Sequence, residues 1–308
     1  MKLTAVLFAL LCASAIVISA LPTALQDQGD VRGAFITSRP KDKPASSSTT
    51  SKPTHRRPRP VTSGDNKNSS GSANVTNRNT NSGSVKPTQQ DNKGPNPVNA
   101  QRLGLGLTLF MRDANGLAVR TDPARAFEKG DRVRVLLETN TDGYLYIFNT
   151  TNDGPAVMIY PSAELDEAGN YIQSHVPFEI PSSLAAEERL RWFSFDEVPG
   201  TERLFFVFTK EPLKGLPIEE DLIALCRDSK GTCPVKPSAD VWAQVQNELK
   251  QPLQSDATAQ SGQTQTPAEQ VATSRGLGLA KDDPQPALIM MASSKTSRLV
   301  TTLDLIHK

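Results

Sequence analysis

Histidine and cysteine are scarce in this chain of 308 residues, which contains three of each. The histidines, His55, His175 and His307, lie far apart and form no zinc-ligand spacing, and the chain has no Gly-x-Ser-x-Gly nucleophile elbow. Carboxylates are therefore the only acid–base groups from which a catalytic site can be argued. This scarcity predicts no metal, no other cofactor and a function other than catalysis.

Apolar and aromatic residues are also few. Hydrophobic residues make up 37% of the chain, against about 45–50% in an ordinary globular protein. Of the 11 Phe, 4 Tyr and 2 Trp residues, 14 lie between Phe110 and Phe208. Because aromatic side chains supply much of a core's buried area, we expect one core of about a hundred residues with poorly packed flanks. A multi-pass membrane protein and a large two-domain enzyme are excluded.

The first 20 residues have the character of a secretory signal. Met1-Lys2 is a short positive region, Leu3–Ile18 is uncharged and mostly apolar, and small residues follow at Ser19-Ala20. The apolar run is short for a membrane span, which needs about 20 such residues. We expect residues 1–20 to be a signal peptide, cleaved or retained as an anchor, with no later membrane span. The mature protein is then secreted or periplasmic and begins with a short segment, residues 21–36.

An oxidising compartment suits the two remaining cysteines. Cys226 and Cys233 are an even pair with six residues between them, too widely spaced for a Cys-x-x-Cys redox site. They are predicted to form a structural disulfide.

Residues 37–100 predict a disordered basic arm. They contain seven apolar residues and eight prolines among 64 residues, and 11 Lys or Arg, including Arg56, Arg57 and Arg59, against three Asp. Such a stretch buries too little apolar surface to fold. The rest of the chain is acidic, since the net charge of the whole is +1. The arm can bind an anionic envelope polymer or serve as a solvated spacer. It lacks the interleaved aromatics of single-strand nucleic-acid binders.

Alternation of apolar and polar residues predicts that residues 101–213 form β-strands. Leu103–Leu109 and Arg132–Val135 alternate with period two, and Gly or Asp-Gly turns separate the runs. In Tyr144–Phe148, the aromatic residues face one way and Leu145 and Ile147 face the other. The fold class predicted is mainly β, a single antiparallel β-sandwich of the jelly-roll or immunoglobulin-like type with long disordered flanks.

The C-terminal third predicts smaller elements. Residues 214–250 suggest two short helices carrying the cysteine pair, the second with Ser238 as its N-cap. Residues 251–275 are rich in Gln, Ser and Thr and predict a disordered linker. Residues 276–308 suggest two strands that complete the sandwich, because an isolated hairpin is only marginally stable.

Several short motifs follow one another along the core: Phe127–Val135, Asn140–Phe148, Tyr160-Pro161, Ile180-Pro181, and Pro199–Leu204 leading to Glu211–Leu213. Their order resembles a bacterial family known as domain of unknown function 4384, over about residues 103–213. Tyr160 departs from the family, which usually has Phe there. The resemblance implies a compact β-sandwich that serves as an accessory or interaction module, and it implies no catalytic residues.

Two sets of residues are candidates for a site. The aromatic residues Tyr144, Tyr146, Tyr160 and Trp192 can form an interaction face or belong to the core. The carboxylates Glu179, Asp196, Glu197 and Glu202 can supply the acid pair of a glycosidase or simply occupy the surfaces of strands.

We therefore expect a secreted or periplasmic, non-enzymatic accessory module of the bacterial cell envelope, with another envelope protein as its partner. The alternatives are a carbohydrate-active hydrolase with paired carboxylates, and a polyanion-binding protein that acts through the basic arm.

Overall fold

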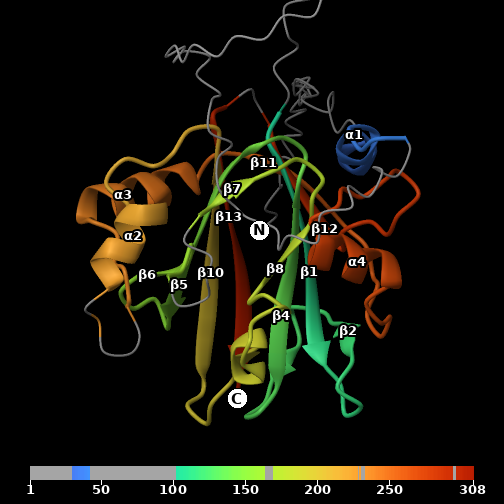
Figure 1. Cartoon of the computed structure of the whole chain (residues 1–308), viewed down its shortest axis with the longest axis horizontal. Helices are drawn as coiled ribbons and strands as arrows, with labels where there is room; N and C mark the ends of the chain where they lie inside the picture. The colour runs from blue at the N-terminus through green and yellow to red at the C-terminus, as the bar shows by residue number, and fades with distance from the viewer. Residues whose placement is uncertain (1–29, 42–101, 164–168, 228, 230–232, 294–295) are drawn as a thin grey trace, which may run out of the picture.

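A computed structural model describes residues 30–41, 102–163, 169–227, 229, 233–293 and 296–308. Two β-sheets face each other, and helices lie on the outer face of each (Figure 1). The predicted mainly β sandwich is confirmed. The predicted signal peptide, residues 1–20, and the arginines Arg56, Arg57 and Arg59 lie outside the described residues. No helix in the described part of the chain is both long and apolar enough to cross a membrane.

The first sheet, sheet A, has seven strands. Its main order is β11-β12-β1-β4-β8, while β2 pairs with β1 and β9 pairs with β4. Both β8 and β9 pair with the same edge of β4, and they leave Arg134 between their registers. The strands are β1 (Gly104–Arg112), β2 (Ala118–Arg120), β4 (Arg132–Thr139), β8 (Phe178–Ile180), β9 (Phe193–Ser194), β11 (Leu253–Ala257) and β12 (Leu288–Ala292).

The second sheet, sheet B, has six strands in the main order β3-β13-β10-β5-β6, with β7 on β5. Its pairs are antiparallel except β3 with β13, which is parallel. The predicted C-terminal strands do complete the sandwich, because β12 joins sheet A and β13 joins sheet B. The strands are β3 (Ala126–Phe127), β5 (Gly143–Thr151), β6 (Val157–Tyr160), β7 (Tyr171–Ile172), β10 (Gly200–Thr209) and β13 (Arg298–His307).

Strand alternation explains the core between the sheets. In β5, Leu145 and Ile147 point into this core, where they meet Val135 of β4 and Phe206 of β10. The aromatic residues of β5, which point the other way, belong to a second apolar cluster outside sheet B. The two faces predicted for Tyr144–Phe148 are therefore confirmed.

The second cluster is covered by the two predicted helices, α2 (Glu219–Cys226) and α3 (Ala239–Glu248). The hydroxyl oxygen of Ser238 accepts a hydrogen bond from the backbone N–H of Val241, which caps α3 as expected. Cys226 and Cys233 form the predicted disulfide at the end of α2.

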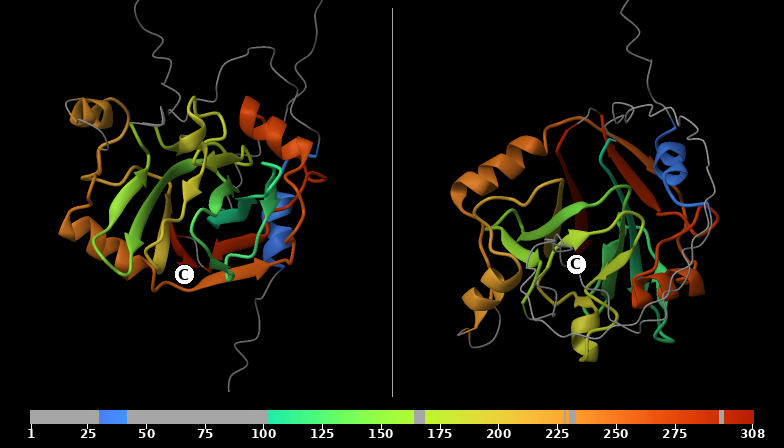
Figure 2. Two further views of the ribbon diagram at one scale, coloured as in Figure 1. Left: turned by 90° about the horizontal axis from the view of Figure 1, so that it is seen from below. Right: turned by 45° about the horizontal axis from the view of Figure 1, so that its top comes forward.

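Two further helices, α1 (Val31–Thr37) and α4 (Pro267–Arg275), lie on the opposite side of the molecule, over sheet A (Figure 2). The prediction of a disordered linker over residues 251–275 is therefore wrong. β11 adds to the edge of β12, and Thr266 and Glu269 form a reciprocal capping box at the start of α4. The segment has little apolar character because α4 contacts sheet A mainly through Glu269, Ala272 and Thr273.

The predicted boundary between a short N-terminal segment, residues 21–36, and an arm starting at residue 37 is also wrong. Asp30 caps α1 by accepting a hydrogen bond from Gly33 N–H. Phe35 and Ile36 pack against Ile289 and Met291 of β12. The chain then continues to the buried residue Arg39. The folded body therefore includes residues 30–41.

Candidate functional site

The outward face of sheet A carries charged side chains that the outer layer covers. In β4, Val133, Val135 and Leu137 point into the core, so Arg134 and Glu138 point outward. Three buried arginine–glutamate pairs lie on this face: Arg39–Glu138, Arg120–Glu269 and Arg134–Glu179. Each pair joins segments that are distant in sequence. The charges are paired because burying a charge without a partner is costly.

The Arg39–Glu138 pair holds the N-terminal segment on β4. Arg39 donates to both carboxylate oxygens of Glu138, at 2.8 and 2.6 Å, and to the carbonyls of Ala280, Asp283 and Pro284 at 2.9–3.1 Å. Burial alone would raise the pKa of Glu138. Hydrogen bonds from His175 and Arg39, together with their charges, outweigh burial and lower this pKa.

His175 connects the same carboxylate to Ser38. Its Nδ1 is 2.7 Å from Glu138 Oε1, and its Nε2 is 2.8 Å from Ser38 Oγ. The order serine, histidine, acid is that of a hydrolase triad. However, Ser38 Oγ donates to the carbonyl of Phe35 at 2.6 Å, and Glu138 is already bound by Arg39. These contacts support a structural role, in which the cluster fastens residues 30–41 to the body.

Arg134 differs from the other two buried arginines. Its side chain is 7% exposed, and its Nε lies 3.3 Å from Glu179 Oε1 without good hydrogen-bond geometry. The guanidinium lies over the ring of Trp192, 4.2 Å from the centroid. Among the described residues, none hydrogen-bonds its two terminal nitrogens. Burial lowers the pKa of Arg134, Glu179 raises it and Arg191 lowers it, with a net decrease.

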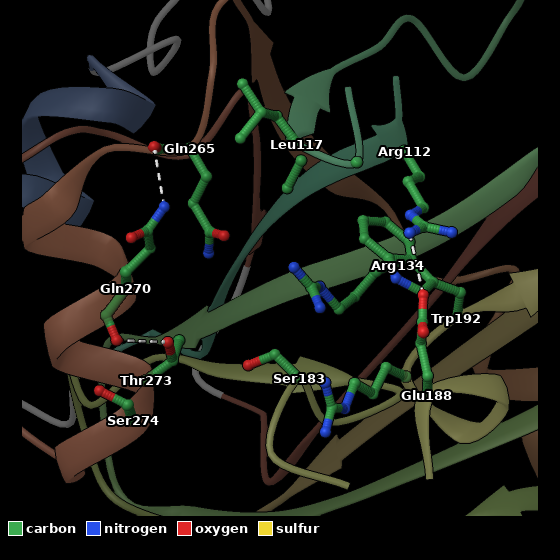
Figure 3. Close-up of a pocket in the computed structure, with 13 residues that line it drawn as sticks. Arg112, Leu117, Arg134, Ser183, Glu188, Trp192, Gln265, Gln270, Thr273 and Ser274 are labelled. Atoms are coloured by element: carbon green, nitrogen blue, oxygen red, sulfur yellow. Dashed lines mark hydrogen bonds and ion pairs between the residues drawn. The ribbon is translucent and has the colours of Figure 1, made fainter. Parts of the chain in front are cut away.

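These terminal nitrogens border a cavity of about 470 Å³. Figure 3 shows Arg134 reaching from β4 toward the middle of this cavity, with Arg112 on one side and α4 on the other. Arg112 pairs with Glu188 at 2.9 Å, and Arg191 donates to the carbonyls of Ala185 and Ala186. The lining residues are Arg112, Gly116, Leu117, Ala118, Arg134, Ser183, Glu188, Arg191, Trp192, Gln265, Gln270, Thr273 and Ser274.

Local structure places each wall of this cavity, which we call the arginine cavity. On one edge of β4, β8 pairs up to Val135 and β9 up to Val133, so Arg134 has no strand partner there. The chain between β8 and β9 passes through the short helix Glu188–Arg191 and leaves the cavity open over Arg134. Gln265 and α4 form the opposite wall, and Gln265 donates to Glu179 Oε1 at 2.6 Å. The arrangement can bind an anion, because three arginines face one space with a single carboxylate, Glu188, among its lining residues.

Residues 126–212 match the family model described as a domain of unknown function, DUF4384. The resemblance noted in the sequence is confirmed for this part of the chain. No curated protein and no solved structure matches the chain. The DUF4384 segment supplies β3 to β10, while β1, β2, β11, β12 and β13 come from outside it. Both sheets, and the arginine cavity, are therefore completed by residues beyond the family match.

The four aromatic residues proposed as an interaction face do not form one. Tyr144 and Tyr146 are buried beneath α2 and α3, whereas Tyr160 lies between the two sheets. Trp192 is on the other side of the molecule, beneath Arg134. Of the two alternatives, the structure supports the core and not the interaction face, because helices cover both sheets and an outward-facing aromatic residue is still buried. Of the four, only Trp192 borders the arginine cavity.

The four candidate carboxylates of the DUF4384 segment do not gather at one site, although two of them, Asp196 and Glu202, line the same cavity. Glu179 is buried beside Arg134, and Glu197 is exposed, where it pairs with Lys129 at 2.6 Å. Asp196 and Glu202 line a second cavity of about 260 Å³ between the sheets, together with His307. Glu202 Oε2 accepts hydrogen bonds from Asn149 at 2.7 Å and Thr151 at 2.9 Å.

Sequence reasoning missed the arginines of the site. Arg134 was visible only as the polar position of an alternating strand, which normally faces solvent. No group of three or more His, Cys, Asp or Glu side chains within the described ranges is arranged to hold a metal ion.

Proposed function

We propose that this protein is a secreted or periplasmic, non-enzymatic accessory module of the bacterial cell envelope, and that it works by binding an anionic component in the arginine cavity. The secretory character of residues 1–20 supports the location. The role of an accessory module is what the resemblance to DUF4384 implies, and residues 126–212 match that family. The sequence favoured another envelope protein as partner. The cavity favours an anionic ligand, and we therefore propose an anion as the bound component.

The observation that carries the proposal is the position of Arg134. A buried guanidinium normally has its donors satisfied, because an unpaired buried charge is costly. Here the terminal nitrogens of Arg134 face a cavity instead of a protein acceptor, while Arg39 and Arg120 on the same sheet face are bound by glutamates. An anion in the cavity would accept these hydrogen bonds and offset the desolvation that lowers the pKa of Arg134.

The test combines location with binding. The full chain is expressed with a C-terminal tag, its cell fraction is determined, and the secreted protein is mixed with purified bacterial envelopes. We expect export and saturable retention by the envelopes, and weaker retention of Arg134→Gln. Arg203→Gln is the matched control, since Arg203 is an exposed arginine on β10. Cytoplasmic accumulation, or equal retention of the Arg134 variant and the wild type, contradicts the proposal.

A second candidate function is a carbohydrate-active hydrolase, which the cavity shared by Asp196 and Glu202 favours. It requires the release of reducing ends from an envelope polysaccharide and the loss of that activity in Glu202→Gln and in Asp196→Asn. A wild-type protein that releases none removes this candidate.

Polyanion binding by the basic arm remains a separate candidate. Because residues 37–41 belong to the folded body, the deletion that tests it must remove residues 43–100 and keep Arg39. Loss of a steeply salt-dependent association after this deletion would support the arm. Unchanged retention on an anionic matrix would exclude it.

A further inference from the structure

We propose that the ligand of the arginine cavity is an acidic sugar, a uronic-acid type of residue whose carboxylate meets the arginines and whose hydroxyls meet the opposite wall. This inference rests on the proposed function, since it names the ligand class for the same cavity.

The arginine side of the cavity suits a carboxylate. Arg112, Arg134 and Arg191 line one space, and the charge of Arg112 is partly balanced by Glu188. A guanidinium presents two parallel N–H groups that match the two oxygens of a carboxylate. Of these three arginines, Arg134 alone has no hydrogen-bond partner for either terminal nitrogen among the described residues. It is therefore placed to make the bidentate contact, with the flanking arginines adding long-range attraction.

The other side of the cavity suits hydroxyl groups. Gln270 and Ser274 on α4 and Ser183 on the loop after β8 line it, and Gln270 and Ser274 are exposed to solvent. Amide and hydroxyl side chains both donate and accept hydrogen bonds, as sugar hydroxyls do. Gln270 Nε2 donates to the carbonyl of Gln265 at 3.4 Å and Ser274 Oγ donates to that of Val271 at 3.3 Å, so the side-chain oxygens of both residues are left to accept hydrogen bonds from sugar hydroxyls. A bare inorganic anion bound by the arginines would not reach them, because it is far smaller than a cavity of about 470 Å³, a volume typical of sites for small organic ligands.

The backbone around the cavity argues against an extended peptide. A peptide usually binds at a sheet edge, where the backbone offers free hydrogen-bond groups. The edge of β2 is taken by the chain before α4, with Arg120 N–H donating to Gln263 at 2.8 Å and Gln265 N–H donating to Ala118 at 2.8 Å. The edge of β4 is taken by β8 and β9. Few apolar residues line the cavity, so a peptide side chain would find little apolar surface.

The experiment uses two-dimensional NMR on the full mature chain, residues 21–308, and follows the tryptophan indole signals. The chain has two tryptophans. Trp192 lies beneath Arg134, and Trp242 packs against Phe148 and Phe205 outside sheet B. The probes are glucuronic acid, its methyl ester, inorganic phosphate and triglycine. The ester keeps the sugar and removes the charge, so it is the matched control ligand.

We expect glucuronic acid to shift the Trp192 signal in a saturable way and to leave Trp242 unchanged. The methyl ester, phosphate and triglycine should bind at least about tenfold more weakly, since each lacks either the carboxylate or the sugar hydroxyls. Arg134→Gln should weaken glucuronic acid by about tenfold or more. Arg112→Gln should weaken it severalfold while leaving the fold intact, because the Arg112–Glu188 pair is partly exposed, with side chains 33% and 62% exposed.

Two results would overturn the inference in different ways. If phosphate or triglycine shifts Trp192 as strongly as glucuronic acid does, and Arg134→Gln abolishes that shift, the ligand class is wrong while anion binding stands. If no probe shifts Trp192, or if both arginine variants bind glucuronic acid like the wild type, the proposed function fails with it.

Discussion

Loss of Arg39 should destabilise the whole body, although Arg39 lies at the start of a stretch that resembles a disordered arm. Its side chain is fully buried, and its partner Glu138 is 3% exposed. Arg39→Met keeps most of the stem and removes the bidentate ion pair with Glu138 and the hydrogen bonds to three carbonyls. Glu138 then remains buried with His175 as its only charged or titratable neighbour in the cluster.

The expected cost follows from this geometry. Breaking a buried ion pair by removing one partner costs about 3–5 kcal/mol, because the other charge is left without compensation. The stability of an ordinary domain is about 5–15 kcal/mol, so Arg39→Met should remove a fifth or more of the total. An exposed pair such as Arg203–Asp304, with side chains 35% and 41% exposed, contributes about 1 kcal/mol or less.

The assay is urea unfolding of the protein, followed by circular dichroism, together with limited proteolysis of residues 30–41. We expect Arg39→Met to lower the urea midpoint far more than Arg203→Met does, and to expose the N-terminal segment to cleavage. Equal midpoints for the two variants would refute the role given to the buried pair.

Three further predictions concern the acid response, the disulfide and the cap of α4. Because the pKa of Glu138 is lowered by folding, its ionised carboxylate stabilises the folded protein above the ordinary value of 4.5, and this contribution to stability is lost as the pH falls below that value. Glu138→Gln should therefore flatten the fall in Tm between about pH 6 and 3. An unchanged slope would contradict this. Replacing both Cys226 and Cys233 by serine should cost about 2–2.5 kcal/mol by loop entropy, measured by urea unfolding, and no loss would show that the bridge is strained or redundant. Thr266→Ala should cost about 1 kcal/mol in the same assay through the lost capping box, and a cost near zero would mean that α4 is held by packing alone.

The strands could be predicted from the sequence because alternation reports directly on burial. The alternation in Tyr144–Phe148 correctly predicts which side chains lie between the sheets and which lie on the outer face of sheet B. Ser238 caps its helix as expected. The outer layer over sheet A could not be predicted in the same way. α4 has no apolar stripe, since it is held by the pair Glu269–Arg120 and by small residues. The one available signal was the sequence Thr266-Pro-Ala-Glu269, which is a capping box.

The candidate site was hidden for a related reason. An arginine in an alternating strand predicts a solvated face, and only a covering layer turns that face into an interior. Glu179, the partner of Arg134, is itself bound by Gln265. Arg39, the partner of Glu138, is 99 residues away from it in the sequence. One sequence contains no information that joins positions so far apart.

The placement of α1 determines where the predicted basic arm joins the folded body. The chain enters residues 42–101 from the buried Arg39, and it leaves them at Arg102, whose carbonyl accepts a hydrogen bond from the same Asn140 that binds Gly104 N–H. A Cβ on Gly104 would lie 2.9 Å from the ring of Phe35, so the start of β1 lies against α1. The described residues on both sides of this stretch are therefore held on the body, so a target bound by Arg56, Arg57 or Arg59 would be joined to the body through the chain on either side.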